Sequence, residues 1–337
     1  MRSGKKPLRN FVNINVWRRG KAMAGIETYQ NKKVILSKER TVPFYLKLKT
    51  REAVAAYIFL APFLIFFSVF FIRATITSIR LSFFDWRLLR PDITFIGFGN
   101  YIELLNDSIW WSAVQNTLFF AIMTVIGATI FGLAAALAVT RPIRGGEFFR
   151  VLFYVPQLMS VGAIGLIWNW LLNTQFGTIN YFLSFFGIAS VNWLGNPDIV
   201  MQSLSMVTIW WTFGFPMLIY IAGLQNIPEQ LYEAARIDGA NAWQTLVYIT
   251  LPLLRPAILF VMVTGFIGHF QVFGQPQIIT AGGGPGRASW TVIIYLFQNA
   301  WVAFRMGFGT AIAMAIAMIM AVVTLIQFKL INRNVEY

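Results

Sequence analysis

Side chains able to do chemistry are scarce in this 337-residue chain. It contains no cysteine, 13 acidic residues and one histidine, His269. Metal sites built on thiolates are therefore excluded, and the scattered acids leave little for a catalytic site. Two polar groups remain: a charged stretch at residues 226–256 and a run of polar side chains that begins at His269. Both suit recognition of another molecule better than bond-breaking chemistry.

The charged stretch reads NIPEQLYEAARIDGANAWQTLVYITLPLLRP and separates two long apolar runs. Its charge is too high for the hydrocarbon core of a bilayer. Pro252 and Pro256 are predicted to end its last helical segment, because proline lacks the N–H that a helix interior needs. The charged residues are Glu229, Glu233, Arg236, Asp238 and Arg255. The stretch is therefore expected at a membrane surface, between two spans.

Local signals predict a helix–turn–helix within this stretch. Asn226 is expected to cap a first helix that Pro228 starts, because the missing N–H of proline costs nothing in a first turn. Gly239 is expected to break that helix, since glycine adopts positive φ cheaply, and Asn241 to cap a second one. Such an element has the shape that docking onto another protein requires.

The second polar group lies inside an apolar run. Gln271, Gln275 and Gln277 follow His269 at i+2, i+6 and i+8. A lone polar residue in a membrane span is by default a pathway or packing residue that faces the interior of the helix bundle. Two interpretations stay open: these side chains line a path for a substrate, or they only hydrogen-bond neighbouring helices.

Hydropathy places most of the chain in a membrane. Hydrophobic residues make up 57% of the sequence and charged residues 12%, whereas about a quarter of a soluble domain is charged. About 20 consecutive apolar residues suffice to span a bilayer. The uncharged runs predict six transmembrane helices, at 53–72, 108–140, 151 to about 172, 199–225, about 257–279 and 306–328.

The predicted connections differ in character. Residues 82–107 mix aromatic, charged and turn residues, and an exposed loop at the membrane interface is expected there. Residues 141–150 place three arginines in a tight turn. The uncharged segment after Leu172 is rich in asparagine and glycine, and it is expected to lie outside with a short surface helix around Tyr181–Phe186.

Residues 288–304 could form a seventh span. They follow the glycine-rich turn AGGGPG at 281–286 and are uncharged apart from the preceding Arg287. The segment is short for a span, however, and contains Gln298 and Asn299. An outside or re-entrant amphipathic helix is therefore the preferred interpretation.

Basic residues indicate the orientation. Fourteen of the 27 lysines and arginines lie in residues 1–53, before the first apolar run. The net charge of +14 could suggest nucleic acid, but this distribution is the positive-inside signal of a membrane protein. The predicted fold is an all-α integral membrane protein with six transmembrane helices, N and C termini cytoplasmic, and a cytoplasmic docking helix between spans four and five. Its parts are a basic cytoplasmic tail at 1–52, a transmembrane domain at 53–332 and a C-terminal tail at 333–337.

Energy for any transport must come from elsewhere. An ion-coupled carrier usually keeps a carboxylate inside the membrane, but all 13 acids fall in tails, loops or the charged stretch. No G-x-x-x-x-G-K-[ST] phosphate loop is present, so a nucleotide is not expected on this chain. A membrane channel that has a structured docking helix and no energy source of its own indicates that a subunit on another chain provides the energy.

The charged stretch carries a resemblance. EAARIDGA at 233–240 with ITLP at 249–252 resembles the EAA signature of bacterial ATP-binding-cassette importer permeases. The similarity extends over about 55–332 to the binding-protein-dependent sugar permeases of the maltose and glycerol-phosphate type. It includes NTLFF at 116–120, RGGEFFR at 144–150, WLGNP at 193–197, AGLQNIPEQLYEAA at 222–235 and GGGP at 282–285. The chain is most similar to the larger permease of such heterodimeric pairs.

The resemblance implies partners and a location. A transmembrane permease domain would sit in a bacterial inner membrane, in contact with membrane lipid but with no nucleic acid. Its partners would be a second homologous permease, an ATP-binding-cassette ATPase dimer that holds ATP and Mg, and a periplasmic or lipid-anchored solute-binding protein. No cofactor is expected on this chain. The residues implied to dock on the ATPase are Glu233, Ala234, Ala235, Arg236, Asp238, Gly239 and Ala240.

The resemblance also implies a substrate pathway for a carbohydrate. The end of the fifth span lines the sugar site in maltose permeases, although amides stand there where this chain has a histidine. Aromatic faces with amide groups suit a sugar, which offers C–H faces and hydroxyls. The implied pathway residues are His269, Gln271, Thr208, Trp211, Thr212 and Phe215. The alternatives are a stand-alone secondary carrier and a non-transporting membrane scaffold, on whose docking helix Glu233 and Arg236 would simply pair with each other.

Overall fold

The computed structural model describes residues 48–90, 92–140 and 145–331, so most of the predicted N-terminal tail and the last residues lie outside it. The chain divides into two units, Met1–Arg73 and Ala74–Tyr337. Helices dominate the described residues. In chain order the elements are α2 (Leu48–Phe66), η2 (Phe67–Ile72), α3 (Arg73–Leu81), β1 (Phe84–Trp86), β2 (Ile93–Phe95), α4 (Gly99–Asn106), α5 (Ser108–Thr140), α6 (Gly146–Tyr154), η3 (Val155–Leu158), α7 (Val161–Leu171), α8 (Thr178–Ser184), α9 (Val200–Thr212), α10 (Gly214–Gln225), α11 (Glu229–Ile237), α12 (Ala242–Thr245), η4 (Leu246–Thr250), α13 (Leu251–Leu253), α14 (Arg255–Phe270), α15 (Gly274–Ile279), η5 (Pro285–Arg287), α16 (Val292–Phe297), η6 (Gln298–Val302) and α17 (Met306–Ile331).

The first predicted span is one long apolar helix. It runs over Thr50–Leu81, and its 32 residues are more than a membrane crossing requires. The helix includes the predicted run 53–72 and continues beyond it, past Arg80 to Leu81. Its middle is a π-helical segment, η2, which follows Pro62 by one turn. Apolar side chains cover all sides of α2, which is the pattern of a helix surrounded by lipid or by another chain.

The predicted loop at 82–107 is more ordered than expected. It contains an antiparallel hairpin of β1 and β2, in which Phe84 pairs with Phe95, and the helix α4. The amide of Asn100 donates to the carbonyl oxygens of Ser82, at 2.8 Å, and Phe84, at 3.0 Å, and so ties α4 to the hairpin. These contacts give residues 82–107 an ordered structure. Their composition alone predicted only that they are exposed.

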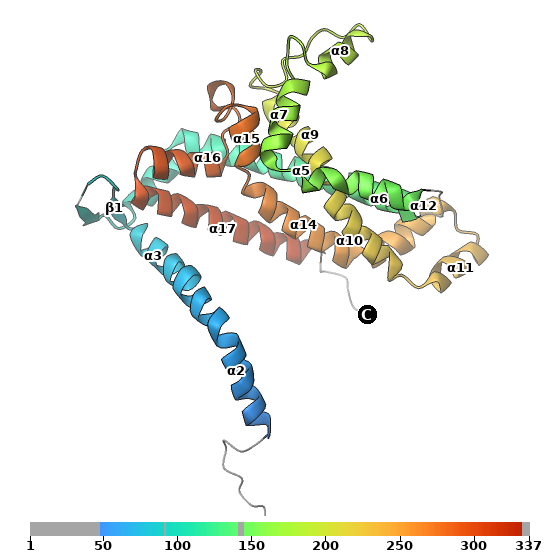
Figure 1. Ribbon diagram of the computed structural model, residues 1–337, viewed down its shortest axis with the longest axis horizontal. Coiled ribbons are helices and arrows are strands. Elements are labelled where there is room, and N and C mark those ends of the chain that lie inside the picture. Colours follow the sequence, from blue (N-terminus) through green and yellow to red (C-terminus); the bar gives the residue numbers. More distant parts are fainter. Residues whose placement is uncertain (1–47, 91, 141–144, 332–337) are drawn as a thin grey trace, which may run out of the picture. The chain divides into compact units, whose positions relative to one another are not determined.

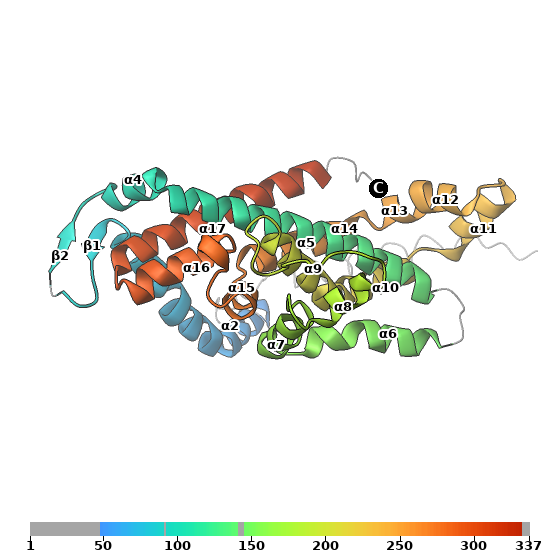
Figure 2. The same ribbon diagram turned by 90° about the horizontal axis from the view of Figure 1, so that it is seen from above.

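Helix α5 is the central element of the second unit. It begins and ends where the sequence predicts, at Ser108 and Thr140, and its 33 residues extend about 50 Å. It packs against α9, α10 and α14, which lie beside it in both views (Figures 1 and 2). Glycines permit this close approach: a Cβ on Gly132 would lie 2.7 Å from Cβ of Pro216.

The third predicted span is sharply bent. It ends at Leu171, as expected, but its two halves, Gly146–Leu158 and Val161–Leu171, meet at 98°. Pro156 in the last turn of the first half and Ser160, whose Oγ accepts from the N–H of Ala163 at 3.2 Å, separate the two helices. The prediction of a tight turn through residue 150 is wrong in part, because α6 begins at Gly146 and Arg150 is helical.

The predicted surface helix after the third span exists as α8, which starts three residues earlier than expected. The turn residues around it act as the sequence suggests. Buried Asn180 donates to the carbonyl of Val191 at 2.9 Å, and its Oδ1 accepts from the indole of Trp193 at 3.0 Å. The segment is therefore held by side-chain amides rather than by a sheet or a disulfide.

The fourth and fifth predicted spans are both bent as well. Helices α9 and α10 meet at 46°, and α14 meets the preceding Ala242–Leu253 segment at 66°. The pivot of the second bend, Leu254, is only 1% exposed. Its side chain packs against Gly223 of α10, where an added Cβ would lie only 2.7 Å from Cδ2 of Leu254. The predicted fifth span, 257–279, is too long: α14 ends at Phe270, and α15 is a separate short helix.

The C-terminal part contains the last predicted span, α17, preceded by the 11-residue helix Val292–Val302. This shorter helix is below the length of a crossing, which favours the preferred interpretation of 288–304 over a seventh span. Arg305, directly before α17, connects this part of the chain to α4, because its guanidinium contacts the Glu103 carboxylate at 2.6 Å. This hydrogen bond raises the pKa of Arg305 and keeps the guanidinium charged. By length and composition, the described residues hold three straight spans and three bent pairs that could each be one.

Candidate functional site

The charged stretch forms the predicted helix–turn–helix. Helix α11 ends in a glycine turn, in which Gly239 adopts φ +78° and the N–H of Ala240 donates to the carbonyl of Ala235 at 2.9 Å. Helix α12 begins with a capping box: the N–H of Gln244 donates to Oδ1 of Asn241, and the N–H of Asn241 donates to Oε1 of Gln244, both at 2.8 Å. Local hydrogen bonds thus account for the shape of the element.

Two details of that prediction are wrong. Asn226 does not cap α11; it ends α10, and its amide donates to the carbonyl of Ala222 at 3.0 Å. Pro228 occupies the cap position itself and makes no side-chain hydrogen bond there. Pro252 does not end the second segment either, because it stands in the first turn of α13 behind the π-helical η4. The break comes at Leu254, just before Pro256, so the prediction that the segment ends at Pro256 is confirmed; Pro256 stands in the first turn of α14.

The outer face of the docking element, which we define by the predicted residues 233–240, is open. Glu233, Ala234, Arg236, Asp238 and Gly239 are exposed, Ala240 is half-buried, and only Ala235 is buried. The ion pairs among the described residues are Arg87–Asp85 and Arg305–Glu103, so Glu233 and Arg236 do not pair. The simple interpretation in which these two charges satisfy each other therefore finds no support.

Apolar side chains flank these charges. Ile237, Trp243 and Tyr248 are 86%, 71% and 75% exposed. On the inner side, the hydroxyl of Tyr232 lies 3.3 Å from Oγ1 of Thr250 and holds α11 against η4. Large exposed aromatic residues beside unpaired charges are typical of a surface that another protein covers. Sequence reasoning missed Trp243 and Tyr248, although an aromatic in a charged membrane-surface stretch is a usable signal.

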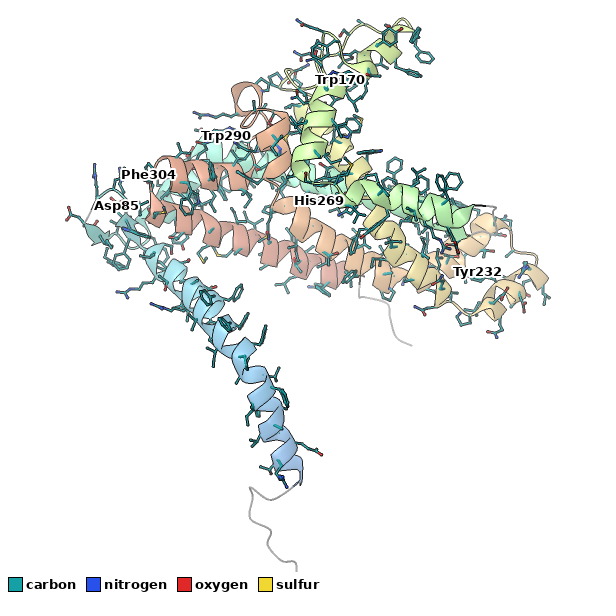
Figure 3. The ribbon with its side chains drawn as sticks, in the orientation of Figure 1. Asp85, Trp170, Tyr232, His269, Trp290 and Phe304 are labelled. Carbon is teal, nitrogen blue, oxygen red and sulfur yellow. The ribbon has the colours of Figure 1, made fainter. Side chains whose placement is uncertain are left out.

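A second site lies inside the helix bundle of the same unit. Figure 3 shows His269 between Asp85 at one end and Tyr232 at the other. His269 borders a cavity of about 190 Å³. The cavity is smaller than the ~300–1,000 Å³ of most ligand sites. Its lining comes from α5, η3, α10, the end of α9 and α14, and consists of Val125, Ala128, Gln157, Thr212, Phe215, Pro216, Val261, Thr264, Gly265, Gly268 and His269.

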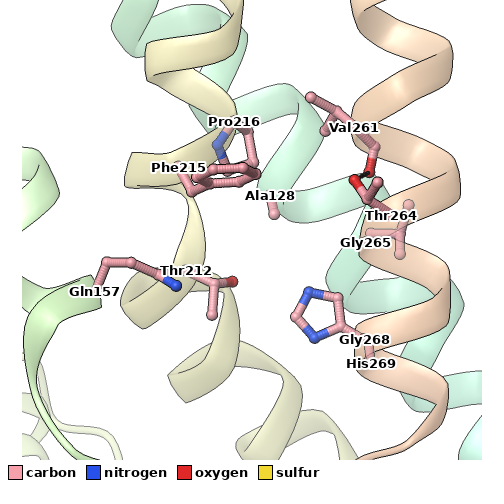
Figure 4. Close-up of a pocket in the computed structure, with 11 residues that line it drawn as sticks. Ala128, Gln157, Thr212, Phe215, Pro216, Val261, Thr264, Gly265, Gly268 and His269 are labelled. Atoms are coloured by element: carbon pink, nitrogen blue, oxygen red, sulfur yellow. Dashed lines mark hydrogen bonds between the residues drawn. The ribbon is translucent and has the colours of Figure 1, made fainter. Parts of the chain in front are cut away.

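The cavity brings together three of the predicted pathway residues. Thr212 and Phe215 flank the bend between α9 and α10, and His269 faces them from the last turn of α14 (Figure 4). The imidazole also packs edge-on against Phe120, with ring centres 6.3 Å apart. A hydroxyl, an aromatic ring and an imidazole around one space can bind a polyhydroxylated molecule through hydrogen bonds and C–H contacts.

The other predicted pathway residues lie elsewhere. Thr208 is fully buried, and its hydroxyl donates to the carbonyl of Leu204 at 2.8 Å. Trp211 packs against the apolar cluster around Leu204 and does not line the cavity. Gln271 lies beyond the end of α14, exposed, with its amide 3.4 Å from the sulfur of Met320. Thr208 and Trp211 belong to α9, as Thr212 does, and Gln271 follows the end of α14, so membership of the expected spans does not by itself bring a residue to the cavity.

Gln157 is one of the lining residues that sequence reasoning missed. It belongs to η3, at the 98° bend of the third span, and points across the cavity toward Thr212 (Figure 4). Its Oε1 is buried and has no hydrogen-bond partner, which leaves an acceptor available inside a largely apolar wall. Gly265 and Gly268 leave space on the opposite wall because they carry no side chains. The sequence did contain a signal for this residue, because Pro156 stands directly before polar Gln157 in an otherwise uncharged run.

Comparison with known proteins places this geometry in context. Residues 128–337 match the family described as binding-protein-dependent transport system inner membrane component. The probable ABC transporter permease protein YurN of Bacillus subtilis is 33% identical over 291 residues, which cover 85% of this chain and 99% of that protein. The sulfoquinovosyl glycerol transport system permease protein SmoG of Agrobacterium fabrum is 32% identical over 87% of this chain and 96% of its own length.

A third relative, the arabinooligosaccharides transport system permease protein AraP of Halalkalibacterium halodurans, is 34% identical over 83% of this chain and 88% of that protein. Among solved structures, the fold is similar to a chain of a bacterial ABC transporter involved in the import of the acidic polysaccharide alginate. The TM-score is 0.71 at 22% identity, over 86% of this chain and 98% of that chain. At that identity the likeness concerns the fold.

Proposed function

The chain belongs to the family of binding-protein-dependent transport system inner membrane components, and from this premise we propose that it is the permease subunit of an ATP-binding-cassette importer that moves a carbohydrate or sugar derivative. One observation carries the proposal beyond the family: the helix–turn–helix of α11 and α12 leaves Glu233 and Arg236 exposed and unpaired. A permease that receives energy from another chain needs such a surface.

The proposed topology has six spans, with both termini in the cytoplasm. Three straight helices and three bent pairs support that number. The distribution of basic residues supports the orientation, since 21 of 27 lie in the segments assigned to the cytoplasm. The α11–α12 element then faces the cytoplasm, and the hairpin and α8 lie on the other side of a bacterial inner membrane.

The ATPase is proposed to dock on residues 233–240. Exposed Ile237 and Trp243 would provide apolar anchors, while Glu233, Arg236 and Asp238 would provide charge complementarity. ATP and Mg would be bound by the ATPase, and no cofactor is assigned to this chain. A second homologous permease and a solute-binding protein complete the assembly; the alginate transporter has been solved with a pentasaccharide-bound periplasmic protein.

The carbohydrate is proposed to pass the cavity around His269. The named substrates of relatives are sulfoquinovosyl glycerol, arabinooligosaccharides and, in Thermococcus litoralis, trehalose or maltose. Gln157, Thr212 and His269 can exchange hydrogen bonds with sugar hydroxyls, and Phe215 offers an aromatic face. Because the cavity of one subunit is small, the second permease would supply the opposite wall. Nothing in the described residues favours a stand-alone carrier, since no acidic side chain lines the cavity.

Reconstitution tests the proposal. The chain, its second permease, the ATPase and the solute-binding protein are placed in proteoliposomes, and uptake is followed with a labelled sugar that the binding protein retains. We expect uptake only with ATP and the binding protein together. Uptake that persists without ATP would instead identify a secondary carrier, and absence of uptake with a fully assembled, ATP-hydrolysing complex would contradict the importer.

His269→Ala tests the pathway. The variant removes the imidazole that faces Thr212, so we expect uptake in the reconstituted system to fall about tenfold through loss of one or two hydrogen bonds. Thr208→Val is the matched control, because the Thr208 hydroxyl bonds only to its own helix outside the cavity. Unchanged uptake by His269→Ala would remove this residue from the pathway.

A further inference from the structure

A second hollow lies at the N-terminal end of α5. It has a volume of about 400 Å³ and is formed by the first turns of α5, the glycine-rich turn before α16 and the loop at Pro197. Polar groups dominate its wall, chiefly Ser108, Ser112, Gln115, Asn116 and Arg287. Under the proposed topology, this end of α5 faces the extracytoplasmic side. The hollow is thus open to the solution from which an importer takes its substrate.

Arg287 is the only ionisable residue in the lining of this hollow. Its guanidinium carbon lies 4.8 Å from the ring centre of Trp290, as in a cation–π pair. The side chain is exposed, and the ion pairs of the described residues do not include it. A positive charge therefore faces the hollow without an acidic partner, beside neutral hydrogen-bonding groups.

The frame around Arg287 is rigid. Trp290 fills the space above Gly283, where a Cβ would lie 2.1 Å from the ring. The N–H of Trp290 donates to the carbonyl of Arg287 at 2.9 Å, and the amide of Asn116 donates to the carbonyl of Trp290 at 3.1 Å. The backbone of Trp290 is thus held at its N–H and at its carbonyl, and its indole lies against the guanidinium.

Arg287 also adopts an uncommon backbone conformation, with φ +68°. A left-handed conformation costs a residue with a side chain roughly 1–2 kcal/mol. Strain of this kind persists where the surrounding structure imposes it, and it concentrates at ligand sites. Glycine would relieve the strain at this position, as it does at the neighbouring Gly286, yet the chain places a guanidinium here.

From this geometry we propose that the hollow is an outer subsite for an acidic sugar, with Arg287 binding its carboxylate or sulfonate and the hydroxyls and amides of α5 binding its ring hydroxyls. A guanidinium matches both anions through paired N–H donors. The volume exceeds what an inorganic ion needs and lies within the ~300–1,000 Å³ of ligand sites. This assignment rests on the proposed function for its orientation and narrows the substrate class to sugars that carry a negative charge.

Direct binding to the full chain in lipid nanodiscs tests the subsite without ATP or partners. Saturation-transfer NMR is recorded with D-glucuronate, with D-glucose as the neutral sugar and with acetate as the anion without a sugar. We expect saturable binding of glucuronate and much weaker binding of glucose and acetate. Equal binding of glucose and glucuronate, or of acetate and glucuronate, would overturn the proposal.

Three variants locate the binding. Arg287→Asn removes the charge while keeping a residue that tolerates the left-handed conformation, and we expect glucuronate binding to weaken about 10- to 100-fold. Arg287→Lys keeps the charge and should bind with intermediate affinity. Arg90→Gln, an exposed arginine outside the hollow, is the control and should bind like the wild type. Melting temperatures of all variants establish that each is folded.

The outcomes are separable from those of the reconstitution. If ATP-driven uptake is present but glucuronate binding is absent or insensitive to Arg287→Asn, the subsite is wrong and the importer stands. If glucuronate binds through Arg287 but uptake needs no ATP, the importer is wrong and the subsite stands. Loss of solute-binding-protein association in Arg287→Asn, with unchanged glucuronate binding, would overturn the subsite in favour of a protein contact.

Discussion

Two glycine turns interrupt the apolar helices of this protein, and they are built differently. Gly239 joins α11 to α12 at φ +78°, and Gly283 lies before α16 at φ +122°. A Cβ on Gly239 would meet nothing within 4 Å, whereas one on Gly283 would lie 2.1 Å from Cδ1 of Trp290. The first glycine is needed for its backbone conformation alone, and the second for conformation and for space.

The hydrogen bonds follow the same division. The docking turn is closed by near neighbours, as in the capping box of Asn241 and Gln244. The glycine-rich turn depends on residues farther away, since the hydroxyls of Ser289 and Thr280 lie 2.8 Å apart and Thr291 donates to the carbonyl of Val272 at 2.8 Å. The first turn is thus closed by local bonds, whereas the second is tied to distant parts of its own unit. Substitutions should separate the two.

The largest effect is expected for Gly283→Ala. The added methyl group would overlap the Trp290 ring and require a backbone conformation that favours glycine, so we expect a loss of about 3 kcal/mol or more in folding free energy. Gly286→Ala is the control in the same turn, because its Cβ would find open space at φ +58°, and it should cost about 1 kcal/mol. Membrane levels and melting temperature in detergent measure both; equal losses would show that space is not limiting at Gly283.

Gly239→Pro should uncouple transport while leaving the protein in the membrane. Proline requires φ near −65° and cannot donate the N–H that Gly239 gives to the carbonyl of Arg236, so we expect ATP-driven uptake to fall about tenfold or more with normal membrane levels. Gly187→Pro is matched in every local respect, with φ +72°, open space and a bond to the carbonyl of Ser184. Normal uptake by Gly239→Pro, or an equal loss in Gly187→Pro, would refute the docking assignment.

The smallest effect is expected for Asn241→Ala. It removes the Oδ1 atom that accepts from the N–H of Gln244 and leaves the backbone N–H that donates to Oε1 of Gln244. We expect this loss to cost about 1 kcal/mol in local stability of α12. Asn226→Ala is the control, since that amide bonds only to the carbonyl of Ala222 at the end of α10 and makes no bond to α12. Hydrogen exchange of the α12 amides measures the difference: faster exchange in Asn241→Ala and unchanged exchange in Asn226→Ala. Unchanged exchange in Asn241→Ala, or equally fast exchange in both variants, would contradict the assignment of Asn241 as the cap of α12.

Features that depend on local chemistry were predictable from the sequence. The bounds of α5, the glycine turn at Gly239 and the Asn241 cap follow from uncharged length and from side-chain preferences within a few residues. The bends at Ser160 and between Thr212 and Gly214 were not predictable, because uninterrupted hydropathy gives no sign of a change in direction. The break at Leu254 lies between Pro252 and Pro256, which were predicted to end the preceding helical segment.

The candidate site shows the same limit. His269 and Thr212 share a cavity as expected, but Gln157 enters it only through the 98° bend, and Trp211, in the same helix as Thr212, packs on the apolar cluster around Leu204 instead. Periodicity within one span identifies a face and does not identify which faces of different spans meet. The hairpin at 84–95 was missed for a similar reason, since its closure depends on Asn100.

The two helices on either side of buried Leu254 can act as the two arms of a lever, with Leu254 as the pivot. One arm, Ala242–Leu253, carries the docking turn, and the other, α14, carries His269 near its tip. At 1.5 Å per residue the arms measure about 18 Å and about 22 Å to His269. Leu254 packs on Gly223 of α10, which makes it the natural pivot. If the two helices turn about this point as one rigid body, a displacement of about 3 Å at the docking turn becomes about 4 Å at the imidazole of His269. Because the two arms have nearly the same length, the displacement of His269 would be close to that of the docking turn. Under the proposed topology, a movement at the cytoplasmic face would therefore reach the middle of the membrane almost undiminished.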